Sequence, residues 1–189
     1  MNIFILNIDD FDSKLLKNLV KADADSLKYK SELKRNQHVL GRFLLKFAAE
    51  KFYNVEDASV YYIEEKPIFK NSSLYFSISH SKNIVAVVIC GNKVGIDVEY
   101  NQRIRDFVAI TERYDTNLSN KMKNMDIDSQ RKEFYEFWTK TEAKIKLNTN
   151  KKAYFTTVYP VDKFTMSIAS EEPFSIDKII NYSDIPIIW

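Results

Sequence analysis

Short strand-like segments follow a long helical segment in close succession, and this order constrains the fold more than any other feature. The expected strands are residues 2–8, 58–63, 74–79, 83–90, 93–99, 153–159 and 163–168. The expected helices are residues 11–24, 31–53, 102–114 and about 129–147. Each half of the chain therefore has the order strand, helix, strands. This order predicts an α+β fold with two similar lobes. The order changes near residue 97, so the lobes are expected to be residues 1–97 and 98–189 of one pseudo-duplicated domain.

The two long helices have one apolar and one polar face. In the first, the apolar stripe is formed by Leu33, Leu40, Leu44 and Phe47, and the opposite face carries Arg35, His38, Arg42 and Lys46. Residues 26–52 hold seven Lys and Arg against two Glu, although the net charge of the whole chain is only +2. In the second, Asp128 or Ser129 is the expected N-cap, and the expected apolar stripe is Phe134, Trp138, Thr141 and Ile145.

Composition excludes several classes of function. A chain of 189 residues with 13 Phe and 11 Tyr can bury a core without disulfides or metal. One cysteine, two histidines and three glycines exclude a disulfide framework, a three-histidine metal site, a Walker A loop and a GxGxxG turn. The small net charge argues against nucleic acid or a membrane as partner, and the absence of a signal peptide indicates a cytoplasmic protein.

The sharpest motif is Gly95-Ile96-Asp97-Val98-Glu99. On a strand, residues i and i+2 share a face, so the carboxylates of Asp97 and Glu99 point the same way. Two hard oxygen ligands from one strand suit Mg²⁺, which takes one or two protein carboxylates and keeps several waters. The alternative for a DxE pattern taken alone is the solvent-facing side of an amphipathic strand.

Two further motifs carry groups that suit phosphate chemistry. Glu142 and Lys146 are four residues apart on the late helix, so they are either a surface ion pair or a metal ligand and base beside a phosphate-binding lysine. Phe76-Ser77-Ile78-Ser79-His80-Ser81 places hydroxyls and an imidazole at a strand end, where they can hold a phosphate or simply hydrogen-bond locally.

Taken together and in order, these motifs resemble the 4′-phosphopantetheinyl transferases of the surfactin type. That family has a basic helix, a Lys-Pro before a short strand, F-x-I-S-H-S, G-I-D-[VI]-E, and a W-[ST]-x-K-E-A-x-x-K helix. The corresponding segments here are residues 35–42, Lys66-Pro67, residues 76–81, residues 95–99 and residues 138–146. The resemblance implies two lobes, each a small, mostly antiparallel sheet packed on a helix, with coenzyme A bound in the cleft between them. It also implies transfer of the phosphopantetheine arm of coenzyme A to a serine of an apo acyl or peptidyl carrier protein, releasing adenosine 3′,5′-bisphosphate.

The resemblance also implies roles for individual residues. Mg²⁺ would be held by Asp97, Glu99 and Glu142. Glu142 would also be the base for the carrier serine, and Lys146 would stabilise the pyrophosphate. Coenzyme A would be contacted by Lys30, Arg35, Arg42, Lys66, Ser79 and His80. The pseudo-duplicated length indicates a monomer, since one chain supplies both sides of the cleft.

The sequence departs from the family pattern at three places. Thr141 stands where the family has a lysine, Glu65 where it has a glycine, and the loop Leu147–Lys152 contains no glycine. These departures leave open a degenerate relative that binds coenzyme A or a carrier protein without catalysis. A Mg²⁺-dependent phosphohydrolase using the same carboxylates is a third alternative.

Overall fold

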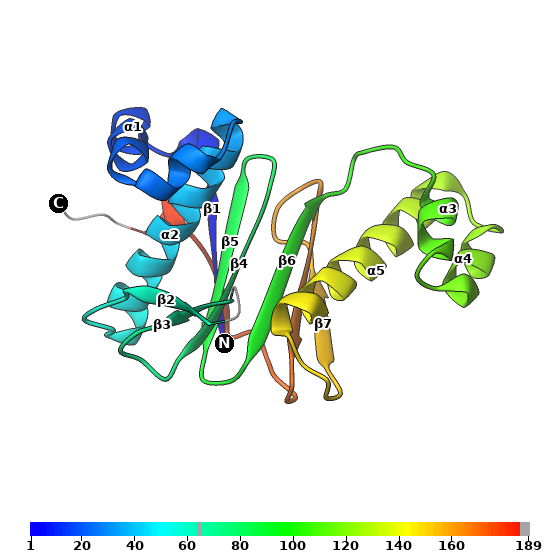
Figure 1. Ribbon diagram of the computed structural model, residues 1–189. Coiled ribbons are helices and arrows are strands. Elements are labelled where there is room, and N and C mark those ends of the chain that lie inside the picture. Colours follow the sequence, from blue (N-terminus) through cyan, green and yellow to red (C-terminus); the bar gives the residue numbers. More distant parts are fainter. Residues whose placement is uncertain (64–65, 186–189) are drawn as a thin grey trace.

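The computed structural model describes residues 1–63 and 66–185 (Figure 1). Its α-helices are α1 (Ser13–Ala22), α2 (Glu32–Tyr53), α3 (Phe107–Glu112), α4 (Thr116–Met122) and α5 (Ile127–Leu147). Its strands are β1 (Asn2–Asn7), β2 (Val60–Ile63), β3 (Lys66–Phe69), β4 (Tyr75–Ser81), β5 (Ile84–Cys90), β6 (Val94–Tyr100), β7 (Tyr154–Val158), β8 (Phe164–Ser170) and β9 (Lys178–Asn181). Short 3₁₀ turns occur at Ile8–Asp10, Ala24–Lys28 and Tyr182–Asp184.

The strands form three small sheets, and the predicted α+β class with two lobes is confirmed. The first sheet has the order β4-β5-β1-β9, the second β6-β8-β7, and β2 pairs with β3 as a hairpin. All pairings are antiparallel except that of β1 with β9. The expected division at residue 97 falls inside β6, and β9 returns from the second half of the chain to the edge of the first sheet.

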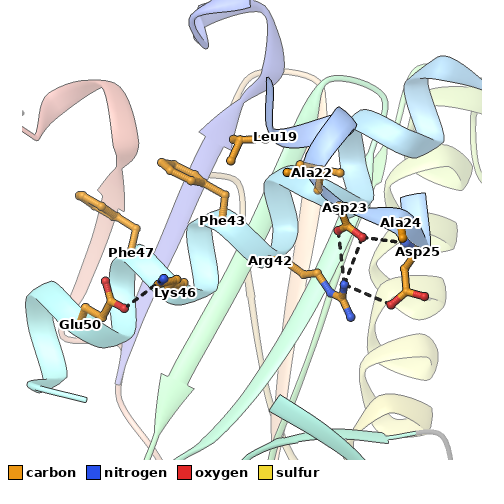
Figure 2. A pocket seen from close by; sticks show the side chains of 11 residues that line it. Leu19, Ala22, Asp23, Ala24, Asp25, Arg42, Phe43, Lys46, Phe47 and Glu50 are labelled. Carbon is orange, nitrogen blue, oxygen red and sulfur yellow. Dashed lines mark hydrogen bonds and ion pairs between the residues drawn. The ribbon is translucent and has the colours of Figure 1, made fainter. Parts of the chain in front are cut away.

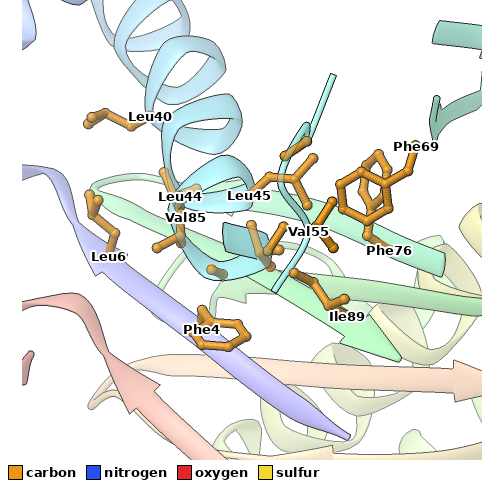
Figure 3. Close-up of a cluster of buried hydrophobic side chains, with 14 of the residues drawn as sticks. Phe4, Leu6, Leu40, Leu44, Leu45, Val55, Phe69, Phe76, Val85 and Ile89 are labelled. Atoms are coloured by element: carbon orange, nitrogen blue, oxygen red, sulfur yellow. The ribbon is translucent and has the colours of Figure 1, made fainter. Parts of the chain in front are cut away.

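The layers are held together by two apolar cores. Residues of α2 such as Leu40 and Leu44 pack on Phe4, Leu6 and Val85 of the first sheet (Figure 3). The other face of that sheet packs on the second sheet, where alternate residues of the facing strands point inward. This second core includes Ile3, Ile5, Ala86, Val88, Val94, Ile96, Val98, Met166 and Ile168. Helix α5 packs against β6 and β8 of the second sheet (Figure 1), so α2 and α5 lie on opposite sides of the two sheets.

Three expectations about local structure are wrong. The N-cap of α5 is Asp126, whose carboxylate accepts from the backbone N–H groups of Asp128 and Ser129, so these two residues lie in the first turn. The expected helix over residues 102–114 is confined to α3, and Asp106 caps it. The prediction also omitted α4 and β9, because each is short and has no clear hydrophobic period. Strand β3, which begins at Lys66, is the short strand that the resemblance implies at Lys66-Pro67.

The apolar stripes of both long helices are shifted from the predicted ones. In α5, Ile145 is 64% exposed, and the buried face is formed by Phe134, Tyr135, Thr139, Ala143 and Leu147. In α2, Leu40 and Leu44 are buried as expected, but Leu33 lies exposed in the first turn. Helix α5 lies close to the second sheet. Its small residues Ala143 and Thr139 therefore face the sheet, and the bulkier predicted residue Ile145 does not. Within the described residues, no helix has both the length and the apolar character of a membrane span.

Candidate active site

A ladder of serine side chains joins β4 to β6 and brings the two sequence motifs together. Ser77, Ser79 and Ser81 alternate along β4, so their hydroxyls share one face. Each hydroxyl oxygen accepts a hydrogen bond from a backbone N–H of β6. The acceptor–donor pairs are Ser77 with Ile96 (3.1 Å), Ser79 with Val98 (3.2 Å) and Ser81 with Tyr100 (3.1 Å). Both strands lie at the edges of their sheets. The serine hydroxyls therefore accept hydrogen bonds from β6 N–H groups that the carbonyl groups of a neighbouring strand would otherwise accept.

The same serines hold the two carboxylates of β6. Ser79 Oγ donates to Asp97 Oδ1 at 2.8 Å, and Ser81 Oγ donates to Glu99 Oε2 at 2.9 Å. Lys146 Nζ of α5 lies 2.8 Å from both Ser79 Oγ and Asp97 Oδ1. Ser79 thus uses its one donor and both of its acceptor positions within the protein. Its hydroxyl therefore positions Asp97 and Lys146 rather than facing the solvent.

The two carboxylates lie on one face, as expected, but in different environments. Asp97 is only 5% exposed, and its Oδ2 atom is buried with no hydrogen-bond partner among the described residues. Glu99 is half-buried, and burial raises the pKa of its carboxyl, with the negative charge of Asp97 adding to this rise and the Ser81 hydrogen bond opposing it. A cation between them would relieve both effects.

Gly95 sets how closely α5 approaches these carboxylates. A Cβ atom at this position would lie 2.0 Å from the carbonyl oxygen of Ala143 and 2.6 Å from the amide nitrogen of Leu147. Both contacts are with helix backbone, which cannot move aside as a side chain can. The glycine of the Gly95–Glu99 motif therefore allows the helix backbone to lie directly on β6, which places Lys146 beside Asp97.

Asp97 and Glu99 fit a magnesium ion, but the predicted third ligand does not join them. Hard carboxylate oxygens on one strand and a buried oxygen without a partner are the donor set that Mg²⁺ uses. Glu142 is half-buried on α5, and no hydrogen bond or ion pair joins it to another described residue. Among the described residues, no three His, Cys, Asp or Glu side chains gather into a group that could hold a metal.

Lys66 and Lys146 line a cavity of about 440 Å³ between β3, β4 and the end of α5. The Lys66 ammonium donates to the carbonyl oxygens of Lys146 (3.1 Å) and Leu147 (3.3 Å), which are free because they end a helix. Burial lowers the pKa of Lys66, and the charge of Lys93 adds to this effect. The structure thus brings the Lys66 ammonium to the backbone at the end of α5, in the cavity that Lys146 also lines.

A second cavity, of about 180 Å³, adjoins the first along β3 and β4, because Pro67, Phe76 and Ile78 line both. His38 and Arg42 of α2 and His80 of β4 line its far end. We refer to these two adjoining cavities as the groove: they share an apolar wall, Lys66 and Lys146 line one of them, and His38, Arg42 and His80 line the other. His80 points away from the serine ladder, since it alternates with Ser79 and Ser81. Desolvation lowers its pKa although part of the ring is exposed, and the charge of Lys146 lowers it further.

The cations on α2 already have acidic partners. Arg42 lies 3.3 Å from Asp23 Oδ2 and 3.4 Å from Asp25 Oδ2 (Figure 2). It also donates to the hydroxyl of Tyr62. His38 Nε2 lies 3.6 Å from Asp23 Oδ2. Burial lowers the pKa of His38, Arg42 lowers it further, and Asp23 acts in the opposite direction.

Two predicted ligand-binding residues lie away from the groove. Arg35 donates to the backbone carbonyl oxygens of Tyr29 and Lys30, so it fixes the segment before α2. The side chain of Lys30 is exposed. A third cavity, of about 820 Å³ between α1 and α2, also lies apart from the carboxylates (Figure 2). It is lined by Leu19, Ala22, Asp23, Ala24, Asp25, Val39, Arg42, Phe43, Lys46, Phe47 and Glu50.

No protein-family model matches this chain, and no curated protein is significantly similar to it. What the site can do therefore follows from its own groups.

The departures from the family pattern have structural explanations at two of the three places. Asn148 ends α5 in the left-handed conformation (φ 52°, ψ 65°), the conformation that a glycine usually supplies at this place. The Thr141 hydroxyl donates to the carbonyl oxygen of Phe137 one turn earlier. Glu65 lies outside the described residues.

Several groups of the site were not assigned a role from the sequence. Ser77 and Ser81 were part of a quoted motif, and their alternation with Phe76, Ile78 and His80 was the signal that they share a face. Asp23, Asp25 and Tyr62 carry no such signal, because the turn between α1 and α2 brings the two aspartates to Arg42.

Proposed function

We propose that this protein is a Mg²⁺-dependent 4′-phosphopantetheinyl transferase that acts on coenzyme A and an apo carrier protein. One observation carries the proposal: the serine ladder and Gly95 hold Asp97, Glu99 and Lys146 together, and Lys146 also lines, with Lys66, a cavity beside them. The groove suits a long, phosphate-bearing ligand, since its two cavities share an apolar wall and each has cationic or titratable groups. Phosphoryl transfer requires positioning and charge neutralisation more than covalent catalysis.

In this reaction the carrier serine hydroxyl attacks the phosphorus next to the pantetheine arm. A bond forms between that phosphorus and the serine oxygen, and the bond from the phosphorus to the bridging oxygen of the pyrophosphate breaks. Adenosine 3′,5′-bisphosphate leaves with the bridging oxygen. The serine proton goes to a base, for which Glu142 is the candidate because its carboxylate has no partner among the described residues. Lys146 and Lys66 offset the charge of the pyrophosphate.

Asp97 and Glu99 are the residues that would hold the metal. A bound Mg²⁺ supplies charge neutralisation for the pyrophosphate and orients it for attack. Ser79 and Ser81 keep the two carboxylates in place by donating to one oxygen of each. In the adjoining cavity of the groove, Arg42, His38 and His80 provide cationic or titratable groups for a further phosphate of coenzyme A.

The experiment that tests the proposal is intact-mass spectrometry of an apo acyl carrier protein incubated with this protein, coenzyme A and Mg²⁺. A mass gain of one phosphopantetheine arm, abolished by chelator, is expected. Release of adenosine 3′,5′-bisphosphate without a carrier would instead indicate a phosphohydrolase. The absence of any gain with several acyl and peptidyl carrier proteins would contradict the proposal.

Glu142→Gln separates the role of base from that of metal ligand. The variant is expected to transfer the arm about 100-fold more slowly, the lower range for loss of a general base. Its affinity for Mn²⁺, measured by calorimetry, is expected to equal that of the parent, since Glu142 does not gather with the β6 carboxylates. A large loss of Mn²⁺ affinity would make Glu142 a ligand instead.

The second candidate function is binding of coenzyme A without catalysis. The observation that favours it is that Asp97 is already neutralised by Lys146 and that, within residues 1–63 and 66–185, no third carboxylate joins the pair of acids. A binding protein would show coenzyme A affinity in calorimetry but no product with any carrier.

A further inference from the structure

Lys146 holds the position that a metal would need at Asp97. Its ammonium lies 2.8 Å from Asp97 Oδ1, at the end of α5 where Gly95 lets the helix touch β6. The lysine side chain is 31% exposed and that of Asp97 8%, so the pair lies at the border between the protein interior and the groove. Lys146 also lines the 440 Å³ cavity, so its flexible side chain can reach either the carboxylate or the groove.

One ammonium does not satisfy Asp97. The Oδ2 atom is buried and has no hydrogen-bond partner among the described residues, and Glu99 contributes a second negative charge on the same face. A buried carboxylate oxygen without a partner is costly, whereas a divalent cation would occupy it and offset both charges. Such a cation and the ammonium would repel each other at this distance, so the two cannot both stay in close contact with Asp97.

We propose that Lys146 is a placeholder for the metal: its ammonium neutralises Asp97 until a divalent cation binds Asp97 and Glu99, and the cation then releases it into the groove. Metal binding at Asp97 thereby makes the Lys146 ammonium available to the pyrophosphate. The contact between the released ammonium and a phosphate rests on the proposed function. The replacement of the ammonium by a metal at Asp97 does not.

The exchange can be measured on the unaltered protein by acylating its lysines and quantifying each site by peptide mass spectrometry. Lys146 is shielded by its contacts with Asp97 and Ser79, so Mg²⁺ is expected to raise its labelling rate several-fold. Lys144 is the internal control, because it lies exposed on the same helix and its rate should not change. An unchanged rate at Lys146 up to high Mg²⁺ concentration would overturn the proposal.

Removing the placeholder should strengthen metal binding. Lys146→Met keeps the length of the side chain without its charge, and Mn²⁺ is expected to bind this variant at least about tenfold more tightly than the parent. Lys144→Met removes a charge nearby and should bind Mn²⁺ as the parent does. In the double variant Asp97→Asn/Lys146→Met the gain should disappear, because the competition takes place at Asp97.

Every other result contradicts the placeholder role. Equal or weaker Mn²⁺ binding by Lys146→Met would make the Lys146–Asp97 contact a permanent ion pair. If Lys146→Met does not fold, the labelling of the unaltered protein decides. Because neither measurement involves coenzyme A or a carrier, exchange without arm transfer would refute the transferase alone, and arm transfer without exchange would refute the placeholder alone.

Discussion

The carboxylates of β6 lie beside Lys146, which lines one cavity of the groove, and His38 and Arg42 of α2 line the adjoining cavity, but the two regions are built differently. Asp97 is almost fully buried and is held by contacts of 2.8 Å from Ser79 and Lys146. Arg42 is half-exposed and meets Asp23 and Asp25 at 3.3 and 3.4 Å. The contacts at Arg42 are longer and reach solvent, so they are weak and can rearrange.

This difference indicates how the two regions, the β6 end and the α2 end, would act. The geometry at β6 is determined by backbone, by hydroxyls of the neighbouring strand and by a helix in direct contact, so it is fixed before any ligand binds. Arg42 of α2 is paired with the side chains of Asp23 and Asp25, and a phosphate could replace these carboxylates. The β6 end therefore suits the chemistry, and the α2 end suits binding of the distal part of the ligand.

The largest effect is expected for Asp97→Asn. This change keeps the shape of the side chain but removes the charge that would bind the metal, so arm transfer should fall about 100-fold or more and Mn²⁺ affinity should be lost. Transfer is measured by intact mass and Mn²⁺ binding by calorimetry. Asp162→Asn, at an exposed position between β7 and β8, should leave both unchanged. Parental transfer by Asp97→Asn would show that the β6 end is not the chemical end.

The next largest effect concerns the contact of α5 with β6. In Gly95→Ala the new Cβ would clash with the helix backbone at Ala143 and Leu147, so the free energy of unfolding should fall by about 3 kcal/mol, at the upper end for overpacking. Gly91→Ala is the matched control, since a Cβ there meets nothing within 4 Å. Denaturant unfolding of both variants measures the difference. Equal stability would show that the close approach does not determine the geometry at Asp97.

The sequence predicts the elements of the fold better than their packing. The long helices and the strands around residues 74–99 have clear periods, and the structure confirms them near the expected ends. The predicted apolar stripe of α5 is wrong at Ile145. Periodicity alone does not show that a glycine on a strand allows the helix face with small side chains to pack against it. The pairing of β9 with β1 could not be foreseen either, since it joins residues from opposite ends of the chain.

At the candidate site, sequence motifs predict which residues lie near one another only when those residues belong to the same helix or strand. That Asp97 and Glu99 share a face follows from their spacing. That Ser79 donates to Asp97, rather than facing a phosphate, depends on β4 and β6 being adjacent edge strands of different sheets. The partners of Arg42 depend on the path of the turn after α1, and no spacing along the sequence reports that path.

A smaller effect is expected from Arg42→Glu. The new carboxylate would stand beside Asp23 and Asp25, so the α2 end of the groove would become acidic and coenzyme A should bind about tenfold more weakly. The Mn²⁺ affinity of Asp97 should not change, because the two ends are separately built. Calorimetry with each ligand provides the comparison. Loss of Mn²⁺ binding in this variant would contradict the separation of the two ends, and unchanged coenzyme A binding would remove Arg42 from the groove's ligand contacts.

The smallest effect is a pH dependence of stability that belongs to the α2 end. Burial, with the charge of Arg42, holds the pKa of His38 below its usual value of 6.5. Above pH 6.5 the imidazole is neutral in both states and the native state keeps its full advantage. As the pH falls through 6.5, the unfolded chain binds the proton first, so stability decreases until the pH has passed the native pKa.

His80 contributes with the same sign, because its pKa is also lowered, whereas the raised pKa of Glu99 makes stability fall as the pH rises. Replacing His38 by Gln should therefore remove part of the histidine-linked loss of stability between pH 7.5 and pH 5 and leave the part due to His80 and Glu99. Urea unfolding of the parent and of His38→Gln at both pH values measures it, and His38→Gln/His80→Gln should be flatter still. If His38→Gln loses as much stability as the parent, the imidazole is not held neutral beside Arg42. Arg42, Asp23 and Asp25 would then have to rearrange even without a ligand, which would make the α2 end more adaptable than the contacts at β6.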